Sequence, residues 1–307
     1  MINLYYKNIH NKSLQPLTKA RKGSWINVID PSDEEIGELV AKYGLDDSLI
    51  IDALDPHEMP RIEVSDKKLY IFTRYAFETR KKFISTYPVL IVKDEDYIYT
   101  VCKDICPYTE SFAQNLYNFT TTQKTKFLLQ IIGAINEGYG MYLTKLNRQI
   151  KAVSTKLEKI TNEDIAKFVE FEKTLNDFIS ALIPANLIFE RIMNQRYLKL
   201  YEEDEDLIID LSLSNSQIIE ITKGAIRNII NIREAYTTII SNNLNKTMKA
   251  LTSITVILTI PTMIYSFFGM NIPLPFERNP LGFVVITLST ITISLLLALI
   301  FRWKKLL

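Results

Sequence analysis

The spacing of hydrophobic and polar positions changes twice along this chain of 307 residues. Up to about residue 118, β-branched and aromatic residues gather in short runs, which is typical of strands. From residue 127 onward, apolar residues recur every three or four positions, which predicts long helices. The last sixty residues hold two runs that are almost entirely apolar. We therefore expect three structural regions. Strands are predicted at Ile2–Tyr6, Trp25–Ile29, Leu69–Phe77, Phe83–Val92 and Tyr97–Cys102.

Residues 1–118 are predicted to form an α/β domain. Ser32 and Glu35 have the spacing of a capping box, which opens a helix that should end near Gly44, and Asp46–Ala53 reads as a second short helix. The last three strands follow one another closely, with a turn at 94–96, which indicates an antiparallel meander. We expect the helices to cover one face of this sheet.

Residues 119–212 are predicted to be long helices. One should run over Phe127–Ile160 and a second from about Asp164 to Leu200, and the acidic run Glu202–Asp206 should separate them from a third. That third helix is expected over 213–268, with 213–249 as a stalk leading to the apolar region. A helix of this length needs neighbours to bury its apolar stripe, so we expect an oligomeric stalk.

Two apolar runs can each cross a membrane. Between 250 and 276, and again between 279 and 301, there is no Asp, Glu, Lys or Arg. We expect spans at 250–268 and 281–301, an external loop at 269–280 and a basic tail at 302–307. Lysine and arginine gather at the inner ends, and the connecting segment has one Arg offset by one Glu, so both termini should face the cytoplasm. This is expected for a multi-pass protein of the plasma (inner) membrane in contact with lipid.

Charge and composition exclude several classes of function. The 36 Lys+Arg residues balance 35 Asp+Glu residues, which argues against nucleic acid as a partner. Cys102 and Cys106 do not have the spacing of a zinc knuckle or a redox motif, so free thiols are expected. We find no glycine-rich phosphate loop, no serine nucleophile motif and no constellation that contains histidine. An enzyme is therefore the least favoured class.

The first predicted span carries its polar residues on one stripe. Hydroxyl residues recur at steps of three and four, and the same seam continues toward the cytoplasm. Such a stripe can line a pore, or it can let helices pack closely without any pore, and the spacing leaves both open. Two spans cannot enclose a pore, so a channel would need several copies. The seam consists of Asn245, Met248, Thr252, Thr255, Thr259, Thr262 and Ser266.

The loop after the first span begins Gly269-Met270-Asn271. This motif at this position resembles the signature of the CorA family of magnesium and cobalt transporters, whose members have two spans and a Gly-x-Asn motif. Asn245, Met248-Lys249, Leu251 and Thr262 also fall at the family's relative spacing. Pro60-Arg61-Ile62-Glu63 and Leu69-Tyr70-Ile71-Phe72 are similar to the segment that leads into its central sheet. One departure is Phe268, where the family most often has Tyr.

The resemblance implies a fold and an activity. It implies an α+β cytoplasmic domain, long helices and a C-terminal transmembrane hairpin, in a funnel-shaped homopentamer that passes hydrated magnesium, and also cobalt and nickel. Asn271 carbonyls would accept hydrogen bonds from water bound to magnesium, which dehydrates reluctantly. Gly269 would permit a sharp turn, and Met270 would pack against neighbours. Leu251 with Met248 could form an apolar constriction, although packing against a neighbour explains Leu251 equally well.

The resemblance also implies closure by cytoplasmic magnesium bound between protomers. Asp210 falls where the family places an acidic ligand, and Glu78 is our candidate partner for it. An ordinary acid near a helix N-terminus would explain Asp210 equally well. Two other functions stay open. One is a zinc transporter of the same fold, although His10 and His57 lie far from both spans. The other is a membrane-anchored protein that transports nothing.

Overall fold

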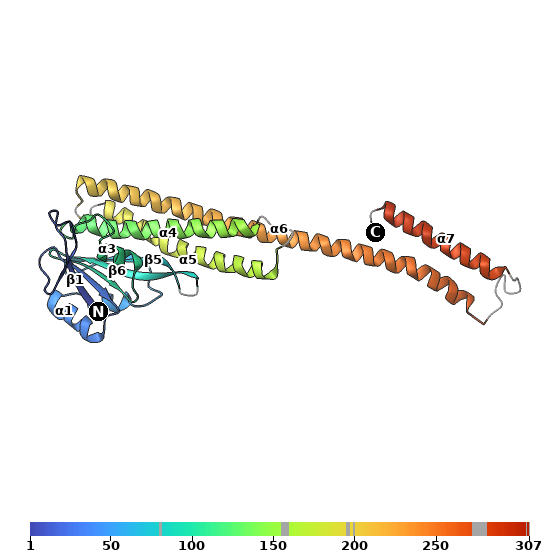
Figure 1. Ribbon diagram of the computed structural model, residues 1–307, viewed down its shortest axis with the longest axis horizontal. Coiled ribbons are helices and arrows are strands. Elements are labelled where there is room, and N and C mark those ends of the chain that lie inside the picture. Colours follow the sequence, from blue (N-terminus) through green and yellow to red (C-terminus); the bar gives the residue numbers. More distant parts are fainter. Residues whose placement is uncertain are drawn as a thin grey trace. The chain divides into compact units, whose positions relative to one another are not determined.

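The computed structural model describes residues 1–79, 82–154, 160–194, 197–198, 200–271, 281–304 and 306. The chain divides into two compact units, Met1–Asn231 and Ile232–Leu307, and helix α6 contributes to both. The elements follow one another in the order shown in Figure 1: β1 Ile2–Tyr6, β2 Gln15–Leu17, β3 Trp25–Ile29, α1 Asp33–Tyr43, α2 Asp47–Asp52, β4 Arg61–Ser65, β5 Lys68–Glu78, β6 Ile84–Lys93, β7 Ile98–Cys102, α3 Pro107–Ala113, α4 Lys124–Ser154, α5 Asn162–Met193, α6 Glu202–Phe268 and α7 Gly282–Trp303.

The first unit is built on a seven-stranded sheet in the order β2-β1-β3-β7-β6-β5-β4. Strands β5, β6 and β7 pair antiparallel, so the predicted meander is confirmed. Only β3 and β7 pair in parallel among these strands. The two-residue turn between β4 and β5 places Asp66 and Lys67 at φ 47° and 62°. Positive φ at both central residues is the type I′ geometry that suits the twist of a tight hairpin.

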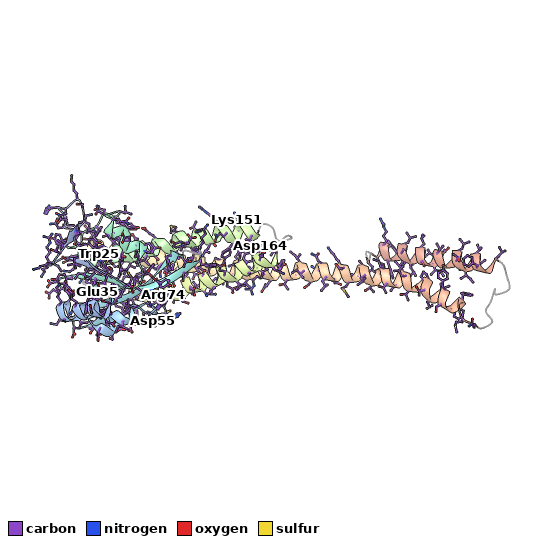
Figure 2. All side chains as sticks on the ribbon, turned by 60° about the horizontal axis from the view of Figure 1, so that its bottom comes forward. Trp25, Glu35, Asp55, Arg74, Lys151 and Asp164 are labelled. Atoms are coloured by element: carbon purple, nitrogen blue, oxygen red, sulfur yellow. The ribbon has the colours of Figure 1, made fainter. Side chains whose placement is uncertain are left out.

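Helices α1 and α2 cover one face of the sheet, as predicted, and α4 covers the other face, which was not predicted. On one face, α1 and α2 pack against β-strand residues such as Ile26, Tyr70 and Leu90 in one apolar cluster. On the other face, Trp25 contacts Phe127 of α4 edge-on, with ring centroids 5.3 Å apart (Figure 2 labels Trp25). Figure 1 shows α1 and α4 on opposite sides of the strands. Strands β5 and β6 carry nearly continuous buried runs, as strands covered on both faces require.

Helix α1 begins and ends where its sequence predicts. The Ser32 hydroxyl accepts a hydrogen bond from the Glu35 N–H (3.3 Å), and the Glu35 carboxylate accepts one from the Ser32 N–H (3.1 Å). At the other end Gly44 takes the left-handed conformation with φ 62°. The predicted capping box and glycine stop are therefore confirmed.

The predicted helix boundaries around residue 200 need correction. Helix α5 ends at Met193, and α6 begins at Glu202, so the acidic run forms the first turn of α6 and does not separate it from a later helix. Carboxylates are favourable in a first helical turn because they face the positive end of the helix dipole. Asp204 also accepts a hydrogen bond from the Tyr201 N–H (3.4 Å). Residues 155–159, predicted to continue the first long helix, lie outside the described part of the chain.

Within the first unit, α6 packs against α4 and α5 through small and polar side chains. A Cβ at Gly133 of α4 would lie 3.3 Å from Leu211 of α6, so the helices approach closely there. The Asn136 amide donates to the Ser214 hydroxyl (3.0 Å). The Asn215 amide donates to the Leu182 carbonyl of α5 (3.0 Å). These contacts fix the register of the first part of α6, where Asp210 lies.

Candidate functional site

The second unit contains two helices that can cross a membrane. The apolar windows of α6 and α7 have mean hydropathies of 1.7 and 2.6, and only 6% of each window is buried. Such exposure of apolar surface is costly in water and favourable in lipid. Trp303, the last residue of α7, is 84% exposed and stands where an interfacial tryptophan is expected.

Helix α6 presents two different faces within this unit. The less exposed positions recur at Ala250, Ser253, Ile257, Ile264 and Phe268, and this face lies toward α7 and the tail. The Ser253 hydroxyl donates to the Leu306 carbonyl (3.2 Å). At 100° per residue, the hydroxyl seam lies about 170° around the helix from this face. The seam therefore points away from α7.

The hydroxyl groups of the seam donate their protons to the helix itself. Thr255, Thr259 and Thr262 each donate to the carbonyl four residues earlier, at 2.9, 2.7 and 2.9 Å. Such local bonds are ordinary for threonine in helices. Each hydroxyl oxygen keeps lone pairs that point outward, so the exposed surface offers acceptors. A surface of acceptors suits a cation or the water bound to it.

Every residue of the predicted pathway is exposed in the single chain. Met248 and Leu251 are 52% and 57% exposed, and the seam threonines, Asn245 and Ser266 are also exposed. A polar stripe that faces lipid would leave its remaining acceptor lone pairs unused, because hydrocarbon offers no donor. The exposed seam therefore calls for other copies of the chain, or another partner, to cover it.

The Gly-Met-Asn motif follows the last residue of α6 directly. The Gly269 N–H donates to the Tyr265 carbonyl (3.0 Å), which closes the helix. Gly269 does not have a positive φ, and a Cβ there would lie 3.4 Å from the Tyr265 carbonyl oxygen, which is no hard clash. The backbone at Gly269 therefore does not itself demand glycine in the single chain, and the predicted role of Gly269 in the loop stays a prediction. Met270 and Asn271 are exposed, and Glu277 and Arg278 lie outside the described residues.

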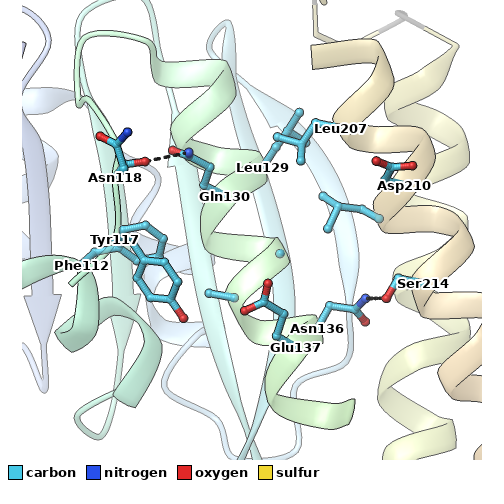
Figure 3. Close-up of a pocket in the computed structure, with 13 residues that line it drawn as sticks. Phe112, Tyr117, Asn118, Leu129, Gln130, Asn136, Glu137, Leu207, Asp210 and Ser214 are labelled. Carbon is cyan, nitrogen blue, oxygen red and sulfur yellow. Dashed lines mark hydrogen bonds between the residues drawn. The ribbon is translucent and has the colours of Figure 1, made fainter. Parts of the chain in front are cut away.

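Asp210 lines a cavity of about 330 Å³ between α4, α6 and the α3 region (Figure 3). Glu137 of α4 lines the same cavity, and so does Asn136, which is 4% exposed. The Asn136 side-chain oxygen has no hydrogen-bond partner among the described residues. Sequence reasoning missed both residues. The sequence does hold a signal for Asn136. Positions 132, 136, 139, 143, 146 and 150 step by four and three along one helix face, and Asn136 is the polar residue in this otherwise apolar series.

Glu78 lies elsewhere in the single chain. Both of its carboxylate oxygens lie 2.7 Å from the Lys145 ammonium, and its N–H donates to the Tyr142 hydroxyl. It does not line the cavity that holds Asp210. Across the described ranges, no group of three or more His, Cys, Asp or Glu side chains could hold a metal ion. Asp210 and Glu137 are the two carboxylates that line the cavity, and the Asn136 amide is a further oxygen group there.

Comparison with known proteins places the chain in context. The family model described as CorA-like Mg2+ transporter protein matches residues 21–305. The chain is 27% identical to the cobalt/magnesium transport protein CorA of Methanocaldococcus jannaschii over 91% of this chain and 89% of that protein. It is 20% identical to the protein of that name from Thermotoga maritima over 98% and 88%.

The fold is also similar to a solved structure. The complete structure of the CorA magnesium transporter from Methanocaldococcus jannaschii superposes with a TM-score of 0.88 at 22% identity, over 98% of this chain and 97% of that one. The sheet unit and the two C-terminal apolar helices thus occur together in a known architecture. With the family model covering all but the first twenty and the last two residues, this chain belongs to the CorA-like Mg2+ transporter protein family.

Proposed function

We propose that this protein is a magnesium channel that also passes cobalt and nickel. The observation that carries the proposal is the uncharged hydroxyl face of α6, which points away from α7 and leads to Asn271. Its acceptor oxygens suit the water shell of a hard cation that dehydrates reluctantly. The relatives named cobalt/magnesium transport protein support magnesium and cobalt as the ions.

Several copies of α6 would surround the pathway, and we infer a homopentamer. The seams would face the axis, the α7 helices would face the lipid, and a ring of Asn271 amides would stand at the outer entrance. Leu251 and Met248 would form the apolar constriction near the inner end. The membrane potential would drive entry, since a unit charge gains about 2.3 kcal/mol per 100 mV and a divalent ion gains about twice that.

Both termini would lie in the cytoplasm, with the hairpin in the plasma membrane. Lys246 and Lys249 precede the first apolar run, and Arg302 and Lys304 follow the second, which supports this orientation by the positive-inside rule. The sheet unit would then sample the cytoplasmic magnesium concentration.

Closure by that magnesium would use Asp210. Asp210 lines a cavity together with Glu137 and Asn136, whose side-chain oxygen has no partner among the described residues. These are oxygen groups of the kind that bind magnesium or accept hydrogen bonds from its bound water. Glu78 remains the proposed partner from the sheet domain, and it would have to exchange its ion pair with Lys145 for the metal.

The two alternatives have less support. A zinc transporter would need nitrogen or sulfur ligands along the pathway, and neither apolar run contains His or Cys. A protein that merely anchors a cytoplasmic domain would need neither the hydroxyl seam nor Asn271. Neither alternative is favoured by an observation of its own.

Magnesium influx into liposomes tests the proposal. The wild-type chain, Asn271→Ala and the control Asn242→Ala would be reconstituted under an inside-negative potential. Asn242 is exposed on α6 but lies off the seam. We expect influx with the wild type and the control, and loss of influx with Asn271→Ala although its assembly is intact. Equal influx in all three would remove Asn271 from the entrance. No influx in any, with zinc moving along a pH gradient, would replace magnesium by zinc.

A further inference from the structure

A second cavity in the first unit is lined by lysines that the transport proposal does not use. Its volume is about 900 Å³, within the range of small-molecule pockets. It lies where the end of β6 meets the starts of α4 and α6, and it does not overlap the cavity that holds Asp210. The lining comprises Lys93, residues 122–126 and residues 201–204.

The three lysines of this cavity differ in how their charge is balanced. The Lys126 ammonium lies 2.6 Å from a carboxylate oxygen of Glu203, so its charge is compensated. The Lys124 ammonium donates to the Glu95 carbonyl (2.6 Å), which carries no charge. The Lys93 ammonium has no hydrogen bond or ion pair with the residues that the structure describes. Lys93 and Lys124 therefore lack a bonded counter-charge, and of the three acidic residues on the lining, Glu203 alone forms an ion pair with a described residue.

The charges of Lys93 and Lys124 also repel each other. Burial lowers the pKa of Lys93, and the nearby charge of Lys124 lowers it further, while Asp94 acts in the opposite direction. The Asp94 carboxylate is already engaged, because it accepts hydrogen bonds from the Asp96 N–H and the Tyr99 hydroxyl. Two like charges beside one cavity cost free energy unless an anion lies between them.

We propose that this cavity binds the phosphate groups of a small molecule of nucleotide size, with Lys93 and Lys124 as the binding residues. A phosphate group carries up to two negative charges and accepts several hydrogen bonds, so one group can neutralise both ammonium ions. Tyr201, 70% exposed on the same cavity, offers a ring for a flat apolar group such as a base. Three carboxylates line the same cavity: Glu203 pairs with Lys126, Asp204 accepts a hydrogen bond from the uncharged Tyr201 N–H, and Glu202 would have to turn away from the bound phosphate.

Titration calorimetry on the full chain in detergent tests the proposal. ATP, inorganic phosphate and adenosine would be titrated separately, with a chelator present so that no divalent cation contributes. We expect ATP to bind and adenosine not to bind. Phosphate that binds as tightly as ATP would support the anion site and identify free phosphate as its source. Absence of binding by both ATP and phosphate at millimolar concentration would overturn the proposal, and so would adenosine that binds as tightly as ATP.

Two lysine variants test whether ATP binds in this cavity. Lys93→Gln and Lys124→Gln should each weaken ATP binding by about 10- to 100-fold, the loss of one charge-assisted hydrogen bond. Lys124 stands at the start of α4, so its replacement leaves the sheet intact. The control is Lys42→Gln, an exposed lysine on α1 that pairs with Glu38. Unchanged affinity in both lysine variants would refute the assignment. Because binding is measured without transport, its failure would leave the proposed function untouched.

Discussion

Replacing Gly138 by alanine should destabilise the first unit. A Cβ built at this position of α4 would lie 1.8 Å from the Tyr108 hydroxyl oxygen and 2.3 Å from the ring carbon that carries it. Both distances are far below van der Waals contact, so the Tyr108 ring must move. The ring is tied in place, because its hydroxyl donates to the Ala76 carbonyl of β5 (2.8 Å) and it packs edge-on against Tyr75.

The size of the effect follows from these contacts. Forcing a side chain out of a packed site costs about 1–3 kcal/mol. Loss of the hydrogen bond to Ala76 costs about 0.5–1.5 kcal/mol. Alanine is better than glycine inside a helix by about 1 kcal/mol, which offsets part of the loss. We therefore expect Gly138→Ala to lower the free energy of unfolding by about 1–3 kcal/mol.

Tryptophan fluorescence during denaturant unfolding measures this change. The chain has two tryptophans, and Trp25 is fully buried in the first unit while Trp303 is exposed, so Trp25 dominates the signal change. Gly140→Ala is the matched control, since its Cβ would meet only Ile218 at an ordinary 3.9 Å. In a Tyr108→Ala background, Gly138→Ala should become neutral or stabilising. A loss that persists in that background, or no loss in the wild-type background, would refute the steric reasoning.

Three further predictions concern regulation, assembly and the buried thiols. Asp210→Asn should raise the magnesium concentration that protects the protein from protease, and an unchanged concentration would exclude Asp210 from the regulatory site. Cross-linking in detergent should give a ladder that ends at five chains, whereas a ladder that ends at two would contradict the pore. Burial raises the pKa of Cys106 to about 11, so a thiolate-selective reagent should label it at about pH 8 only after unfolding. Since the unfolded thiol ionises at about pH 8.5, the stability that this burial contributes should fall as pH rises from there toward 11, and rapid labelling of the native protein would contradict it.

The sequence predicted the elements whose signals are local. Strands β1 and β3 have the predicted bounds, because each is a short β-branched or aromatic run. Two edge strands and one helix were missed. Strand β2 is three residues long with Pro16 at its centre, a position that only an edge strand tolerates. Strand β4 exposes Val64 and takes its register from β5. Helix α3 had a usable signal, since Pro107 stands at its first turn.

The hydroxyl seam is legible in the sequence, but its direction is not. The steps of three and four identify a stripe on α6, while its placement opposite α7 depends on which residues α7 covers. That choice is made by tertiary contacts such as the bond from Ser253 to the Leu306 carbonyl. The same holds for Asp210. Its neighbour Glu137 lies 73 positions away along the chain, and only the packing of α4 on α6 brings the two carboxylates to one cavity.

The proposed ion path along α6 carries no charged side chain, and this affects the rate at which ions would pass. A carboxylate about 4 Å from a divalent ion, at an effective dielectric constant near 20, would attract it by about 8 kcal/mol. Release from such a well would be slowed by roughly a million-fold. Threonine oxygens along the proposed path would create only shallow minima, so an ion would dwell briefly at each position. The absence of acidic residues from 250 to 268 would thus favour rapid turnover over tight capture.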